Sequence, residues 1–131
     1  MKKKIFGKST MHVAGTSYKD RQGKLMCLRK AESAFLTLRR EPKNEHDACA
    51  IQVIAHTTAK SGKKSVFCIG YIPADKADTW MAKAMDAGKI VRVAKYNVVG
   101  GGKTSLGCEI TVNHELFEKE IPDEATAPAE A

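Results

Sequence analysis

The stretch LRREPKNEHDACAIQV, residues 38–53, decides the fold that we expect for this chain. It overlaps the end of a strand-like run, residues 34–40, whose apolar side chains give way to two arginines. It then leads into a second strand-like run, residues 48–55. The loop between them, residues 40–47, combines turn-forming residues with charged side chains. Such a loop is either a solvated turn or a binding site on a rigid frame.

Working outward from this unit, hydrophobic patterning predicts six strands. In chain order they are residues 11–18, 34–40, 48–55, 65–72, 89–99 and 106–112. The fourth run is almost continuously apolar, which predicts a central position in a sheet. Two of the connections, around Gly62 and at residues 100–103, have the composition of hairpin turns.

The expected helices are few. The main one begins at Ala74 or Asp75 and ends near Ala87, between the fourth and fifth strands, and a short helix follows the first strand. This order predicts a mainly β fold, a small six-stranded barrel of the OB-like or SH3-like kind. A parallel α/β sheet would need more crossover helices.

Three segments follow from the same patterning. Residues 1–10 are basic and irregular and are expected to form a flexible arm, while residues 11–118 form the domain. Residues 119–131 are expected to form an acidic, disordered tail. The lysines at the start of the chain precede no apolar stretch of signal-peptide length, and no run approaches a membrane span. We therefore expect a cytoplasmic protein, associated with the nucleoid if it binds DNA.

The formal net charge of +7 is unevenly distributed along the chain. Residues 1–64 carry 15 Lys and Arg against 5 Asp and Glu, whereas residues 65–131 carry 7 against 10. A basic half beside an acidic half indicates a surface that faces a polyanion. Lysine-rich surfaces are common in soluble proteins, so charge alone favours nucleic acid only modestly.

The loop supplies two kinds of recognition chemistry. Arg40 and Lys43 can pair with phosphates, and Asn44, His46 and Asp47 can make directional hydrogen bonds. Asp47 would repel phosphate, so attraction between charges does not explain it. An acceptor for a hydroxyl or base donor explains it, and so does an ordinary turn-stabilising role.

Three blocks of sequence resemble the signature blocks of the HIRAN domain family. They are VAGTSY at residues 13–18, the stretch at residues 38–53, and IGYIP at residues 69–73 with a helix after it. The resemblance covers roughly residues 11–88 and extends plausibly to residue 112. Each block alone is weak evidence, whereas three in order at compatible spacing are fairly specific.

The resemblance implies a modified OB-like barrel that binds single-stranded DNA, captures a free 3′-hydroxyl end, and acts in DNA repair or replication. By that resemblance Tyr18 contacts the terminal nucleotide, and Asn44 and Asp47 lie in the end pocket. His46 stands where a base-stacking tyrosine is common, and Tyr71 lines the same pocket.

Two departures from the family pattern favour general single-strand affinity over end capture. The position after the Tyr-Ile-Pro block is often basic, and here it is Ala74. The hairpin at residues 98–106 has no aromatic residue to stack on a base.

Two other readings compete with DNA binding. One is a protein-interaction domain that recruits a helicase or nuclease through an edge strand. The other is a metal-dependent nuclease, which would need the carboxylates of Glu41, Glu45 and Asp47 to cluster. We expect no catalysis, because neighbouring His46 and Asp47 would point apart on a strand. Nor do we expect a cofactor, a membrane partner or a small-molecule substrate. We expect no metal site, because the cysteines lack metal-ligand spacing, and a site assembled from scattered Cys and His residues is the weaker alternative.

Overall fold

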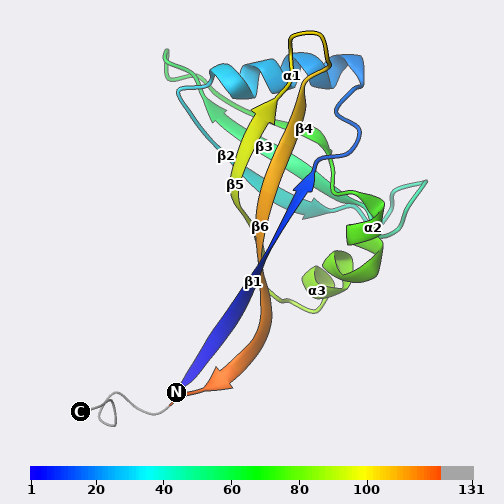
Figure 1. Ribbon diagram of the computed structural model, residues 1–131, viewed down its shortest axis with the longest axis vertical. Coiled ribbons are helices and arrows are strands. Elements are labelled where there is room, and N and C mark those ends of the chain that lie inside the picture. The colour runs from blue at the N-terminus through cyan, green and yellow to red at the C-terminus, as the bar shows by residue number, and fades with distance from the viewer. Residues whose placement is uncertain (122–131) are drawn as a thin grey trace.

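The computed structural model describes residues 1–121 and contains two β-sheets and two helical segments (Figure 1). In chain order the elements are β1 (Lys2–His12), α1 (Lys19–Lys30), β2 (Ser33–Arg40), β3 (Ile51–Thr58), β4 (Lys64–Tyr71), α2 (Ala74–Lys76), η1 (Ala77–Met81), α3 (Ala82–Asp86), β5 (Val91–Val99) and β6 (Gly107–Glu120). The short pieces α2, η1 and α3 are continuous, with a π-helical turn in the middle. They are the helix predicted between the fourth and fifth strands. No helix in this part of the chain is long and apolar enough to span a membrane.

The six strands form two antiparallel sheets of three strands each. Their orders are β1-β6-β5 and β2-β3-β4. The mainly β class is therefore confirmed, but the described residues form two open sheets and no closed barrel. The predicted closure fails because β2 and β5 lie close together without a hydrogen-bonded ladder between them.

One core joins the two sheets and the helices. Alternate residues of the central strands β3 and β6 point inward, which is the period-two pattern of a half-buried strand. Each of these elements contributes buried side chains to the core, for example Leu25 and Leu28 of α1, Val53 and Ala55 of β3, Met81 of η1, and Ile110 and Val112 of β6. Burial of each larger aliphatic side chain contributes about 1.5–3 kcal/mol. The core fixes both sheets, and with them the loops at their ends.

The expected basic arm is wrong, because residues 2–12 form the long strand β1. This strand pairs with β6 along its whole length, from Lys2 opposite Glu120 to His12 opposite Glu109. Figure 1 shows this pair extending away from the body, with the N-terminus at its far end. The lysine-rich composition predicted a loose arm, but the Nζ atom of Lys4 lies 3.5 Å from a carboxylate oxygen of Glu115 on the partner strand. Strand β6 also runs past residue 118, and the expected tail beyond residue 121 lies outside the described part of the chain.

The expected central position of the fourth strand is also wrong. The order β2-β3-β4 makes β3 central and β4 an edge strand. The apolar run misled because it includes residues of both faces: Ile69 is fully buried, whereas Val66 is 65% exposed. Apolar composition alone does not separate a doubly covered strand from an edge strand with an exposed apolar side chain.

The segment after β1 is brought against the end of β4 by a glycine. Ala14 and Tyr71 exchange two backbone hydrogen bonds of 2.7 and 2.9 Å. Gly70 has a φ of +155°, and a Cβ there would collide with the carbonyl oxygen of Ala14. The strand expected over residues 11–18 therefore stops at His12, and Tyr18 becomes the N-cap residue of α1.

Candidate nucleic-acid interface

A cavity of about 600 Å³ lies where three separate segments of the chain meet. The segments are residues 14–21, the polar loop, and residues 71–74 at the end of β4. Five of the seven site residues predicted from the sequence line it: Tyr18, Asn44, His46, Asp47 and Tyr71. The tertiary structure thus brings together residues that are up to 53 positions apart in the chain.

Two tyrosines and an arginine form one wall of this cavity. The Cζ atom of Arg21 lies 4.9 Å from the ring centroid of Tyr18 and 5.4 Å from that of Tyr71, both within cation–π range. Its Nη1 atom donates a 2.8 Å hydrogen bond to the carbonyl oxygen of Gly15, which fixes the guanidinium. Among the described residues that line the cavity, Arg21 is the one that carries a positive charge. Arg21 was not among the residues predicted from the sequence, although it stands three positions after Tyr18 at the start of a helix, a spacing that places two side chains on one face.

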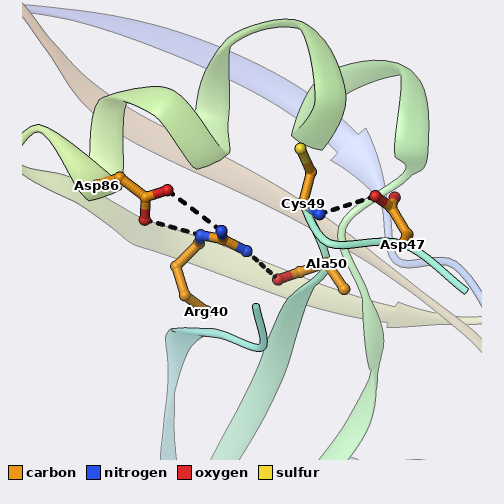
Figure 2. Close-up of polar contacts among 5 residues, drawn as sticks. All are labelled: Arg40, Asp47, Cys49, Ala50 and Asp86. Carbon is orange, nitrogen blue, oxygen red and sulfur yellow. Dashed lines mark hydrogen bonds and ion pairs between the residues drawn. The ribbon is translucent and has the colours of Figure 1, made fainter. Parts of the chain in front are cut away.

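The polar loop is held by its own side chains. The Oδ1 atom of Asn44 accepts hydrogen bonds from the backbone N–H groups of His46 (2.8 Å) and Asp47 (3.0 Å). One carboxylate oxygen of Asp47 accepts a 2.8 Å bond from the N–H of Cys49 (Figure 2). These are the local bonds by which Asn and Asp stabilise turns. Asn44 therefore shapes the cavity through the loop, while Asp47 both fixes the turn and lines the cavity.

Glu41 connects the loop to the end of β4. Its carboxylate accepts hydrogen bonds from Asn44 Nδ2 (2.7 Å), the Tyr71 hydroxyl (2.8 Å) and Gln52 Nε2 (3.3 Å). The bonds from Asn44 and then Tyr71 hold the pKa of Glu41 below its usual value. Burial, followed by the hydrogen bond to Glu41, raises the pKa of Tyr71. Local sequence carried no sign of the connection to the sheet, because Gln52 and Tyr71 come from β3 and β4.

The structure places Arg40 and Lys43 outside the cavity. Arg40 points to the helical segment, where its Nε and Nη2 atoms lie 2.9 and 3.2 Å from the carboxylate of Asp86 (Figure 2). Its Nη1 atom donates a 2.8 Å bond to the carbonyl oxygen of Ala50. The hydrogen bond from Arg40 lowers the pKa of Asp86. Arg40 thus fastens the loop to α3, and Lys43 is exposed on the loop without lining the cavity.

A group of potential metal ligands lies beside the cavity. Side-chain ligand atoms of Asp47, Cys49 and Asp78 lie within 4.8 Å of one another. A hydrogen bond with Asp47, followed by burial and charge repulsion from it, raises the pKa of Asp78. Two carboxylates and a thiol are donors that a divalent cation accepts. This group differs from the cluster of Glu41, Glu45 and Asp47 that the nuclease reading would need. Glu41 is bonded to Tyr71, and Glu45 is exposed on the loop.

Comparison with known protein families agrees with the three sequence blocks. A family model described as the HIRAN domain matches residues 6–116 of the 131-residue chain. The chain therefore belongs to the HIRAN domain family, a family of nucleic-acid-binding domains. No curated protein and no solved structure gives a significant match.

Proposed function

We propose that this HIRAN domain binds single-stranded DNA and that the cavity receives the terminal nucleotide with a free 3′-hydroxyl. The observation that supports this most directly is the convergence of Tyr18, the loop residues 44–47 and Tyr71 on one cavity that also contains Arg21. Its volume, about 600 Å³, lies within the range of pockets that take small organic groups.

Stacking and charge provide the affinity in this proposal. The ring of Tyr18 is 64% exposed at the mouth of the cavity, where a base can stack on it. His46 is also exposed along the same lining and offers a second flat ring. Arg21 contributes the positive charge that Ala74 does not, so the basic role has moved from the end of β4 to the start of α1. Its guanidinium is suited to a phosphate oxygen.

Asp47 provides the selectivity for the end. A carboxylate accepts a hydrogen bond from a hydroxyl, and such a bond to a charged acceptor contributes about 1.5–3 kcal/mol. A 3′-phosphate would instead bring a second anion against the same carboxylate. The cavity therefore favours an unmodified 3′ end over a phosphorylated one.

We also propose that binding proceeds without chemistry on the DNA. The described lining contains His46, Asp20 and Asp47 but no serine, cysteine or lysine that could act as a nucleophile. A domain that holds free 3′ ends suits DNA repair or replication, because both processes expose such ends. A labelled oligonucleotide incubated with the protein and Mg²⁺ or Mn²⁺ should stay intact.

The test is a fluorescence-anisotropy titration with oligonucleotides that differ only at the 3′ terminus, at two salt concentrations. The wild-type protein should bind the 3′-hydroxyl form more tightly than the 3′-phosphate form, and both should weaken with salt. Asp47→Asn should reduce the preference by roughly 10- to 150-fold, the equivalent of about 1.5–3 kcal/mol. Glu45→Gln is the matched control, because it removes an exposed carboxylate of the same loop that does not line the cavity.

The outcomes separate the parts of the proposal. Equal affinity of the wild type for both ends would remove end capture and leave single-strand binding. Equal changes in Asp47→Asn and Glu45→Gln would mean that Asp47 acts only as a negative charge. Absence of binding at low salt would overturn the proposal as a whole.

A further inference from the structure

The outer face of the sheet β2-β3-β4 carries an exposed row of flat and apolar side chains. Phe35, His56 and Val66 lie directly opposite one another on the three strands. Phe35 is 60% exposed and Val66 is 65% exposed, whereas Leu36 and Ile69 of the same two strands point to the opposite face and are buried in the core. In the described part of the chain no helix or loop covers these two side chains.

Two of these residues form a fixed stack. The rings of Phe35 and His56 have centroids 4.5 Å apart and planes only 6° from parallel. The Nε2 atom of His56 also lies 2.8 Å from the hydroxyl of Thr37, two residues from Phe35 on the same face. A stacking surface that is already ordered loses little side-chain freedom when a ligand binds.

The charged side chains on the strands of this face are all basic, and the Glu41 carboxylate reaches the face only at its cavity end, where it accepts hydrogen bonds from Gln52 and Tyr71. The strands β2, β3 and β4 contain no Asp or Glu, and their basic residues are Arg39, Arg40 and Lys64. Arg39 and Lys64 are exposed and lie at opposite ends of the outward face, whereas Arg40 is turned toward Asp86. Aromatic side chains between basic residues are the combination that binds single-stranded nucleic acid.

This face is continuous with the cavity. Arg39, Gln52 and Tyr71 form another row across the same three strands, and Tyr71 lines the cavity. Four residues of β2 separate this row from the one that contains Phe35, a distance of roughly 13–14 Å along an extended strand. A single strand whose end is in the cavity can therefore continue over the sheet.

We infer that the Phe35–His56 stack is a second nucleotide-binding site, which takes bases on the 5′ side of the nucleotide in the cavity. Arg39 and Lys64 face the phosphates on either side of it. This inference rests on the proposed single-strand binding and adds a length requirement to it. A short oligonucleotide fills the cavity alone, and a longer one fills the cavity and the stack.

The experiment compares 3′-hydroxyl oligonucleotides of about three and about ten nucleotides, lengths below and within the usual site size of such folds. Phe35→Ala should weaken binding of the longer oligonucleotide by roughly 5- to 150-fold, the loss expected for about 1–3 kcal/mol of base stacking. It should leave the shorter one unchanged. Phe35→Tyr should keep wild-type affinity for both, and circular dichroism should confirm that the variants are folded.

The control variant is Phe117→Ala, which removes a 54% exposed aromatic side chain from the other sheet. It should bind both lengths as the wild type does. Equal affinity of Phe35→Ala and wild type for the longer oligonucleotide would overturn the inference, even if the 3′-end preference is intact. Loss of the 3′-end preference with a retained, length-dependent effect of Phe35→Ala would overturn end capture and support the second site.

Discussion

The sheet β2-β3-β4 and the sheet β1-β6-β5 carry the same formal net charge but arrange it differently. The first has three basic residues and no acidic ones, whereas the second has seven basic and four acidic residues, so each has a net charge of +3. In the second sheet the opposite charges are brought together: Lys4 lies 3.5 Å from Glu115, and the N-terminal amine 2.8 Å from Glu120. The first sheet has no such internal partners on its strands.

This difference shows that net charge does not locate a nucleic-acid surface. A lysine beside a glutamate presents a weak field to a distant phosphate, because the two charges largely cancel. A basic residue on strands that contain no carboxylate, such as Lys64, keeps more of its field, and the aromatic side chain of Phe35 is exposed on the same sheet. By this argument the basic N-terminal run, where lysines are most concentrated in the sequence, is less suited to DNA than the sheet β2-β3-β4.

The strongest test of the comparison removes one exposed aromatic side chain at the cavity and one from the sheet β1-β6-β5. Tyr18→Ala should weaken single-strand binding by roughly 5- to 150-fold, because stacking of one base contributes about 1–3 kcal/mol. Phe117→Ala should have no effect, although its ring is about as exposed. Anisotropy titrations of both variants measure this. Equal losses would show that the β1–β6 pair also binds DNA and would end the contrast.

A smaller effect should appear in the salt dependence. Arg21→Gln should lower the slope of log affinity against log salt by about 1, as expected for one lost phosphate contact. Lys4→Gln should leave the slope unchanged, because Lys4 is already next to Glu115. Titrations at four or more salt concentrations give both slopes. A steeper loss for Lys4→Gln than for Arg21→Gln would reverse the assignment of the binding face.

The smallest effect concerns the stability of the loop in acid. The pKa of Glu41 is below its usual 4.5 in the folded protein, so its contribution is present above about pH 4.5 and is lost as the pH falls through the lowered value. Glu41→Gln should therefore be less stable than wild type by about 1 kcal/mol at neutral pH. The difference in stability should shrink as the pH falls below 4.5 and through the lowered pKa of Glu41. Denaturant unfolding across this range measures it, and a constant difference at all pH values would contradict the role given to Glu41.

Much of the local structure could be predicted from hydrophobic patterning. The strands on either side of the polar loop and the helical segment after Pro73 follow from apolar spacing and turn residues. Six strands were predicted and six form, but the first was expected at residues 11–18, whereas β1 is Lys2–His12. The bonds within the loop are equally local, since Asn44 and Asp47 contact backbone groups two or three residues away. Interactions between residues so close in the chain can be predicted from the local sequence.

The partners of long or charged side chains were decided by the tertiary structure. Arg40 opens the loop and was expected to face a phosphate, but α3 brings Asp86 to it. Arg21 lies in a charged segment for which no binding role was predicted, yet the fold places its guanidinium against the rings of Tyr18 and Tyr71. An arginine side chain reaches groups far from its own strand or helix, so its neighbours depend on elements that are distant in the chain.

Strand pairing also depends on residues that are distant in the chain. The sequence alone determined that this is a mainly β domain with a polar loop between two apolar strands, because side-chain alternation is a property of neighbouring residues. Only the tertiary structure made β1 a strand, since its ladder with β6 joins residues 97 to 118 positions apart, from His12 with Glu109 to Lys2 with Glu120. Strand pairing also put β4 at an edge, brought Tyr71 to the loop, and left Phe35 exposed and stacked on the half-buried His56.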